Sequence, residues 1–292
     1  MSLLHRRAGR AFAFVVTVLA LPLCSLQAAS YEWGFTSGNL NADLGGGSLV
    51  HAGLTGNITT FGTTNGTTVP HIGGTPASYM SVPQMPSNTY GYDLTLTNSG
   101  PNGGGSYINQ YTFAFDMLVP ALPGTGYLAL LNTNASNAND ADFYIVASAG
   151  AANVGVTGNP YSAGAPFALN AWNRLVITAD LAVGSIKMFI NGTRVVNATG
   201  YTVDGTWALF SNANAGSDVR LFNENYADAN NYTQAFYLSA ASFVDRTYSE
   251  SEVAALGGAK AAGILVPEPS TAVLLLGSLG ALALRRRRPA SR

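Results

Sequence analysis

The stretch from residue 170 to residue 195 constrains the fold of this chain more than any other part of it. It reads NAWNRLVITADLAVGSIKMFINGTRV and contains two runs of strand length, RLVITAD and SIKMFI. Successive side chains of a strand point to opposite faces, so each run has one apolar face. The Asn191-Gly192 pair signals a two-residue hairpin turn that folds residues 193–195 back on the second run. The predicted core positions are Leu175, Ile177, Ala179, Ile186, Met188 and Ile190.

Short strands of the same kind recur along the chain between glycine-rich turns. Of the 292 residues, 33 are glycine and only 10% are charged, which suits strands and tight turns. Ser249 and Glu252 form a capping box and Gly257 can end a helix, so we expect one short helix from Glu250 to about Leu256. The pattern predicts an all-β fold, a sandwich of two antiparallel sheets. The other predicted strands are residues 31–35, 92–97, 111–119, 127–132, 142–148, 207–211, 219–223 and 235–244.

The charges are distributed unevenly between the ends of the chain and its body. The segment from Ala29 to Val266 has six basic and fourteen acidic residues, a net charge of −8. Nucleic-acid phosphates require clustered lysine and arginine, so we exclude nucleic acid as a partner. The single cysteine, Cys24, precedes this segment, which excludes disulfides and cysteine-based zinc sites from the body.

The N-terminus has the pattern of a secretory signal peptide. Three arginines precede an apolar stretch from Ala11 to Leu23, and small residues follow near Ala28. We therefore predict export by the Sec machinery and removal of residues 1–28. A buried N-terminal helix and a lipoprotein anchored at Cys24 are the alternatives.

The C-terminus combines a proline-flanked glutamate, an apolar run and a basic cluster. Thr271 to Leu284 are fourteen uncharged residues, which as a helix would be about 21 Å long, less than the ~30 Å hydrocarbon core of a bilayer. The arginines after this run would stay cytoplasmic. The run is thus a marginal membrane stop, and a plain C-terminal anchor is one interpretation of it. The residues of this pattern are Val266, Pro267, Glu268, Pro269, Arg285, Arg286, Arg287 and Arg288.

These residues closely resemble the PEP-CTERM sorting signal of Gram-negative bacteria. The resemblance implies recognition by an exosortase, a membrane transpeptidase, with transient contact of the tail with the inner membrane. It also implies release or transfer to the cell surface or extracellular matrix, often in bacteria that make exopolysaccharide. We divide the chain into a signal peptide (1–28), the β-sandwich domain predicted above (29–262) and a sorting tail (263–292).

The second half of the body resembles the LamG-like, concanavalin A-like jelly-roll family. In that family a tryptophan opens a strand that ends near an aspartate, and a second strand runs into an Asn-Gly turn. Trp172, Asp180 and Asn191-Gly192 occupy those places, and SFVDRTYSESEVAALGG is similar to the closing strand and helix. Thr247-Tyr248-Ser249 departs from the usual Ala-Leu-Ser. The resemblance is weak before Tyr111, where the fold is assigned by continuity.

No arrangement of acids in the sequence matches the catalytic pair of a glycosidase. The body has four glutamates, Glu32, Glu224, Glu250 and Glu252, and none forms the alternating Glu-x-Asp-x-x-Glu of jelly-roll glucanases. The remaining candidates are Asp116 and Asp180 on strands, and loop acids such as Asp140 and Asp142 beside an Asn-rich turn. Two histidines, His51 and His71, are placed in loops rich in glycine and threonine. We predict no catalytic residues.

Calcium is the cofactor that the sequence could accommodate. Hard cations take carboxylate and amide oxygens, and the densest set lies in SDVRLFNENYADANNY before the closing strand. A polar loop whose side chains satisfy their own backbone is the alternative. If a metal binds, the expected ligands are Asp218, Glu224, Asp228 and Asn230.

Three functions remain open from the sequence. The first is a noncatalytic, surface-sorted module that binds glycan, exopolysaccharide or matrix, or is a structural part of the matrix. The second is a divergent glycan hydrolase or lyase, for which the sequence lacks an inward-facing acid pair. The third is an ice- or surface-adhesion protein, for which the threonines of FGTTNGTTV are too few.

Overall fold

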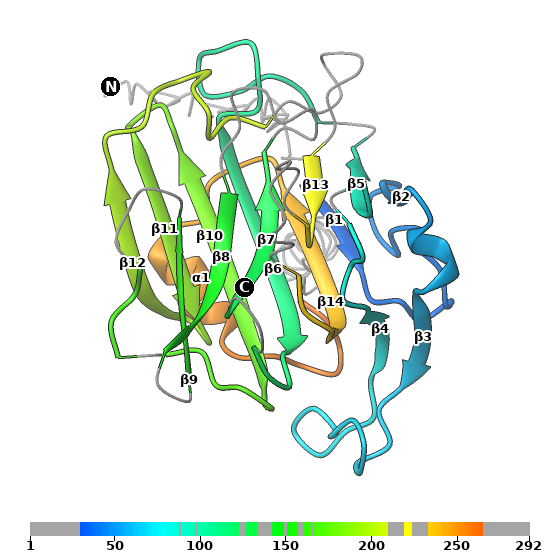
Figure 1. Ribbon diagram of the computed structural model, residues 1–292. Coiled ribbons are helices and arrows are strands. Elements are labelled where there is room, and N and C mark those ends of the chain that lie inside the picture. Colours follow the sequence, from blue (N-terminus) through cyan, green and yellow to red (C-terminus); the bar gives the residue numbers. More distant parts are fainter. Residues whose placement is uncertain are drawn as a thin grey trace, which may run out of the picture.

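The computed structural model describes residues 30–87, 89–96, 99–122, 126–133, 142–148, 151–156, 161–164, 166–209, 219–223 and 233–264. These residues form two antiparallel sheets packed face to face (Figure 1). The large sheet has the order β12-β11-β10-β6-β14-β4-β3, and β1 also pairs with β14. Its strands are β1 (Ser30–Trp33), β3 (Thr60–Thr63), β4 (Ser78–Val82), β6 (Gln110–Leu118), β10 (Trp172–Asp180), β11 (Ser185–Ile190), β12 (Thr193–Thr199) and β14 (Phe236–Val244).

The small sheet has the order β2-β5-β13-β7-β8-β9, again antiparallel throughout. A 3-10 turn, η1 (Thr55–Asn57), follows its edge strand, and the helix α1 (Glu250–Leu256) lies outside the sandwich. The fold is therefore the two-sheet jelly roll with a short terminal helix that the sequence predicts. The strands of this sheet are β2 (Ser48–Ala52), β5 (Gly91–Thr95), β13 (Val219–Leu221), β7 (Tyr127–Asn132), β8 (Asp142–Ser148) and β9 (Ala151–Val156).

The hairpin predicted from residues 170–195 is confirmed in its register and in its turn. Leu175 pairs with Ile190 and Ile177 with Met188, and all four side chains are buried between the sheets. Asn191 has φ 51° and Gly192 has φ 84°, the left-handed pair that a two-residue hairpin turn needs. A side chain at position 192 would meet the backbone of α1, so the turn also requires glycine for packing.

The predicted terminal helix is also confirmed. The Ser249 hydroxyl accepts a hydrogen bond from the Glu252 backbone N–H, and the Glu252 carboxylate accepts one from the Ser249 N–H, which completes the capping box. Gly257, with φ 65°, ends the helix. The seven-residue helix is thus fixed by local signals at both of its ends.

Some strand predictions are wrong or incomplete. The predicted strand 207–211 is not a strand in its described part, where Leu209 makes one isolated bridge to Ile108. Its apolar residues are buried as a loop, because the Trp207 ring packs on Phe143 and its carbonyl accepts a bond from Tyr111. Strands β2, β3, β4 and β9 were not predicted. Their short, mixed sequences become strands through partners elsewhere in the chain.

The large sheet buries side chains on both of its faces. Its inner face packs on the small sheet and forms the main core. Its outer face has a second apolar cluster, and α1 lies on this side, away from the small sheet (Figure 1). This cluster consists of Ala114, Val176, Phe189 and Ala240 on the strands, Val253 on the helix, and Ile264.

Candidate functional site

A buried ion pair lies on the outer face of the large sheet. Asp116 on β6 and Arg174 on β10 are register partners, so the alternation of both strands turns their side chains to the same face. The Arg174 Nε and Nη2 atoms donate to Asp116 Oδ1 and Oδ2, both at 2.6 Å. Both side chains are 0% exposed. Such a bidentate pair is among the stronger contacts that a guanidinium makes.

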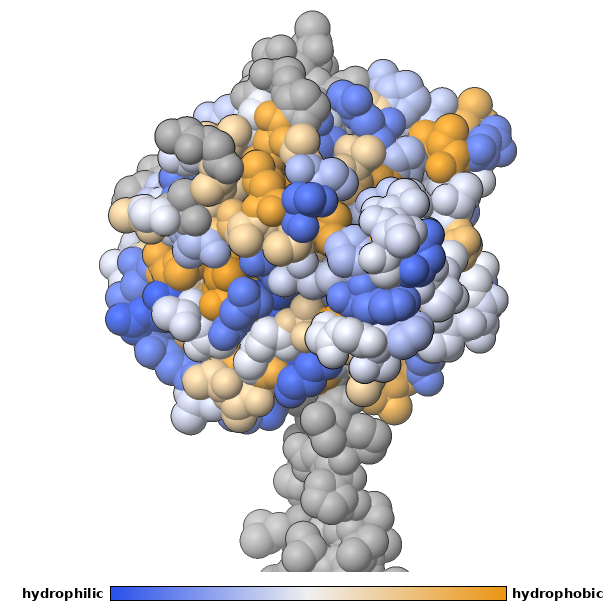
Figure 2. Space-filling model, turned by 90° about the horizontal axis from the view of Figure 1, so that it is seen from below, coloured by the Kyte–Doolittle hydropathy of each residue, from blue (hydrophilic) through white to orange (hydrophobic). Residues whose placement is uncertain are grey.

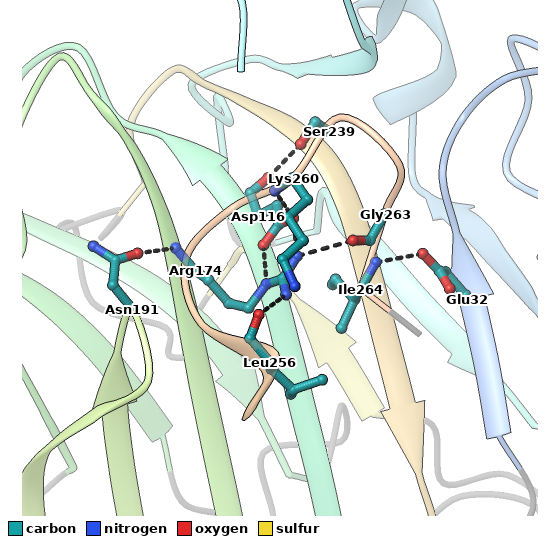
Figure 3. A network of polar contacts seen from close by, with 9 residues as sticks. All are labelled: Glu32, Asp116, Arg174, Asn191, Ser239, Leu256, Lys260, Gly263 and Ile264. Carbon is teal, nitrogen blue, oxygen red and sulfur yellow. Dashed lines mark hydrogen bonds and ion pairs between the residues drawn. The ribbon is translucent and has the colours of Figure 1, made fainter. Parts of the chain in front are cut away.

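The same pair also holds the chain that follows α1, residues 257–264, which we call the strap. Arg174 Nη1 donates to the Leu256 carbonyl at 2.8 Å, and Nη2 donates to the Gly263 carbonyl at 2.9 Å. The Lys260 N–H donates to Asp116 Oδ2 at 3.1 Å. Figure 3 shows the strap curving over the pair, with these groups turned toward it. Burial raises the pKa of the Asp116 carboxyl, opposed by the bonds from Arg174 and Lys260.

The end of the strap is fixed by the first strand of the body. The Ile264 N–H donates to Glu32 Oε1 at 2.7 Å, and Ile264 itself is 2% exposed (Figure 3). Gly263 has φ 94°, and a Cβ there would lie 2.1 Å from the same Glu32 oxygen. The chain therefore leaves the body through a position that only glycine fits.

The strand carboxylates considered for catalysis do not come together. Asp116 faces Arg174, and Asp180 accepts a bond from Gln110 Nε2 across the sheet at 3.0 Å. Asp142 is the first residue of β8, and Asp140 lies outside the described residues. The contact of Asp116 was missed because its basic partner is 58 positions away in the sequence. Asp116 and Asp180 thus each have a structural contact.

The predicted metal ligands and sorting residues lie outside the described part of the chain. This applies to the calcium set Asp218, Glu224, Asp228 and Asn230, and to residues 266–269 and 285–288. The described residues contain no cluster of three or more histidine, cysteine, aspartate or glutamate side chains. They also contain no helix with the length and apolar character to cross a membrane.

A shallow hollow of about 440 Å³ lies beside the edge strand β2. The loop at residues 38–41 forms one wall and is joined to β2 by the bond from the Leu49 N–H to the Leu40 carbonyl, 3.0 Å. The Phe61 ring of β3 lines another side. The hollow therefore lies where the edges of the two sheets approach each other. Its lining residues are Gly38, Asn39, Leu40, Asn41, Ser48, Leu49, Val50, His51 and Phe61.

His51 lies on β2, not in a loop as predicted, because β2 forms by pairing with β5. Its ring packs on Tyr92 at 5.6 Å, and its Nδ1 atom is buried without a hydrogen-bond partner. Burial lowers the pKa of His51, which favours the neutral form of the ring. The other histidine of the body, His71, is in a loop as predicted and its Nδ1 contacts the Thr64 hydroxyl. The hollow was missed because its walls come from three separate segments.

Surface hydropathy differs from one part of the described surface to another. Figure 2 shows one end of the molecule, where polar residues separate the apolar ones. Most of the exposed large apolar side chains of the described residues lie between residues 44 and 58, around β2 and η1. They are Leu44, Val50, Leu54 and Ile58, and the others are Val183 and Val203.

Comparison with known families identifies the tail that follows the strap. Residues 265–288 match the PEP-CTERM protein-sorting motif. The PEP-CTERM motif is the signal carried by exosortase substrates, and it indicates export and sorting to the surface through transient contact with the membrane. The motif begins one residue after the buried end of the strap, Ile264.

Comparison with solved structures identifies the fold of the body. The binding domain of Paraclostridial Mosquitocidal Protein 1 is 14% identical with a TM-score of 0.50, over 79% of this chain and 51% of that chain. The botulinum neurotoxin serotype G binding domain is 13% identical (TM-score 0.49; 77% and 50% covered). This chain thus spans about half the length of these toxin domains. Domain 4 of AbnA, a GH43 extracellular arabinanase from Geobacillus stearothermophilus, in complex with arabinotriose, is 16% identical (TM-score 0.47; 79% and 99% covered). A search of curated proteins finds no match.

Proposed function

We propose that this exported, PEP-CTERM-sorted jelly roll is a noncatalytic module that binds a neutral glycan or exopolysaccharide at the surface or in the extracellular matrix. The observation that carries the proposal is the joining of a surface-sorting motif to a body with a hollow of mixed lining beside β2. The Phe61 ring can pack on the apolar face of a sugar, and Asn41 and Ser48 supply amide and hydroxyl groups. Its volume lies within the range of small-ligand sites.

The placement of the acids supports a noncatalytic role. Glycoside hydrolysis needs an acid and a second carboxylate facing one groove. The described carboxylates with identified contacts instead accept hydrogen bonds from other groups of the body or form ion pairs with its basic side chains. They are Glu32, Asp43, Asp93, Asp116, Asp180, Asp204, Glu250 and Glu252.

The processing partner in this proposal is an exosortase acting at the inner membrane after Sec export. The final location is the cell surface or extracellular matrix of a Gram-negative bacterium. Export and sorting follow from the motif, whereas the identity of the ligand is the part that needs a direct test.

The binding test uses the mature protein recovered from the cell surface on a glycan array. We expect binding to one class of neutral glycan, reduced at least tenfold by Phe61→Ala and by Asn41→Ala. Asn197→Ala is the matched control, because this exposed asparagine lies on β12, at the other edge of the large sheet. Melting curves of each variant separate loss of binding from loss of fold. Glycan binding that neither hollow variant changes would remove the hollow from the proposal, and no binding to any glycan would refute it.

The same mature protein tests the absence of catalysis. We expect no hydrolysis of β-glucans, agar or chitin. Turnover of any such polymer that a single Asp→Asn or Glu→Gln change abolishes would favour the hydrolase alternative instead.

A further inference from the structure

The strap joins the sandwich to the sorting motif, and it is held to the body at both of its ends. Arg174 bonds the carbonyls of Leu256 and Gly263, which stand immediately before the strap and near its far end. Asp116 bonds the Lys260 N–H between them (Figure 3). One buried ion pair therefore closes the strap into a loop on the sheet.

A partial loosening of the strap would leave charged groups without part of their hydrogen bonding while they are still buried. Arg174 and Asp116 are both 0% exposed, so water does not replace the strap carbonyls and N–H unless the cover lifts. Bonds to a buried ionised group are stronger than neutral ones and costly to leave unmade. The strap is thus held by bonds whose loss would raise the free energy of the protein.

The far end of the strap has a second, independent attachment. The Ile264 side chain belongs to the apolar cluster of the outer face, with Ala114 and Val176. Its N–H is bonded to Glu32 of β1, a residue 232 positions earlier in the chain. The described attachment therefore extends to Ile264, and the matched sorting motif begins at the next residue.

We propose that Glu32, Arg174 and Gly263 are positioning residues for removal of the tail. They keep the chain on the body as far as Ile264, so that cleavage is confined to the sorting motif and the strap stays on the sheet as the C-terminus of the mature protein. This role goes beyond the proposed function, since it does not depend on what the body binds.

Chain length shows how much the attachment matters. Three peptide units separate Ile264 from Pro267, a reach of about 10 Å even when fully extended. Release of the eight strap residues would add up to about 27 Å of free chain. The attached strap therefore holds the body close to the membrane enzyme, and a released strap supplies new segments for proteases to cut.

Gly263→Ala tests the proposal at the point where the chain leaves the body. The added Cβ would collide with Glu32 Oε1, while the side chains of Asp116 and Arg174 are not themselves substituted. Gly200→Ala is the matched control, because Gly200 has a similar φ, 98°, and no atom within 4 Å of the added Cβ. Both full-length variants are produced in the native host, and the mature surface protein is analysed by C-terminal mass spectrometry and by limited trypsin digestion.

We expect the wild type and Gly200→Ala to show a single C-terminus beyond Ile264 and slow cleavage after Lys260. Gly263→Ala should be cut after Lys260 at least tenfold faster, and its mature C-termini should extend back into the strap. Circular dichroism and the melting curve report whether the sandwich remains folded.

Two outcomes would overturn the proposal. If Gly263→Ala leaves cleavage after Lys260 slow and the mature C-terminus unchanged, the attachment of the strap does not depend on the glycine at position 263. If cleavage after Lys260 becomes fast while the mature C-terminus stays the same, the strap is only a cover and positions nothing for processing. Should Gly263→Ala not fold, Glu32→Ala makes the same test, because it removes the acceptor of the Ile264 N–H without adding an atom. The glycan array result is independent of all these outcomes.

Discussion

The two faces of the large sheet are buried in different ways. The inner face packs large aromatic side chains such as Phe113, Phe115 and Phe243 against the small sheet. The outer face has a smaller apolar cluster with one phenylalanine, Phe189, one buried ion pair, and a cover made of a seven-residue helix and the strap. Apolar contact has no direction, whereas the bonds of Arg174 have fixed donors and acceptors. The difference indicates that burial stabilises the inner face and that polar bonds fix the position of the cover on the outer face.

The largest effect is expected from the inner face. Phe113 is 1% exposed, and its ring lies 4.9 Å from that of Phe243 and 5.9 Å from that of Phe115. Phe113→Ala should lower the free energy of unfolding by about 3–5 kcal/mol through lost burial and a cavity. Urea unfolding followed by tryptophan fluorescence measures this loss. A cost below ~1 kcal/mol would mean that the inner face is not the main source of stability.

On the outer face, one substitution should lower the free energy of unfolding by a similar amount, and a second substitution should restore most of it. Arg174→Met leaves Asp116 buried without its cation, which costs about 3–5 kcal/mol. Arg174→Met with Asp116→Leu removes both charges and should recover most of that loss in urea unfolding, since apolar side chains often replace a buried pair at little cost. If the double variant is as unstable as the single one, the strap bonds themselves are the main contribution of Arg174.

A smaller effect is expected at the start of the helix that covers the outer face. Ser249→Ala removes the hydroxyl that accepts the Glu252 N–H and should cost about 1 kcal/mol. Hydrogen exchange should increase in α1 and the strap before it increases in β6. Ser251→Ala, which keeps the cap, is the control. An equal increase in exchange on both faces would contradict their separate stabilisation.

The smallest effect is a dependence of the cover on pH. The Arg246 guanidinium lowers the pKa of Glu252 to about 2 from an ordinary value of 4.5, with burial acting against it. The carboxylate therefore stabilises the folded state above pH 4.5, and this contribution is lost as the pH falls toward 2. Because the side chain is 43% exposed, the contribution should stay below ~1 kcal/mol. Urea midpoints at pH 6 and pH 3, with Glu252→Gln as the variant that lacks this dependence, measure it.

The features that the sequence predicts well are those encoded within about twenty residues. The alternation in 174–190 gives the core face, Asn191-Gly192 gives the turn, and Ser249 with Glu252 gives the helix start. The sorting motif is likewise a contiguous pattern. Local sequence determines each of these features, so one sequence is enough to recognise them.

The contacts that the sequence did not predict join residues far apart in the chain. Asp116 was considered as a strand carboxylate, and its basic partner Arg174 could be identified only through the register of β6 with β10. Glu32 and Ile264 are brought together by the pairing of β1 with β14. Alternation assigns a residue to a face but does not identify the strand beside it. The hollow beside β2 was missed for the same reason.

The pairing of β1 with β14 has a consequence for the timing of folding during export. A chain that crosses the membrane N-terminus first delivers β1 long before β14, so the first strand waits outside without its neighbour. Such long-range pairing makes the contact order high and folding late. The bond from Ile264 to Glu32 forms only when the last residue of the body has crossed, just as the sorting motif arrives at the membrane. The strap therefore cannot attach to β1 until translocation of the described body is almost complete, and a chain stalled before β14 leaves β1 without this partner strand.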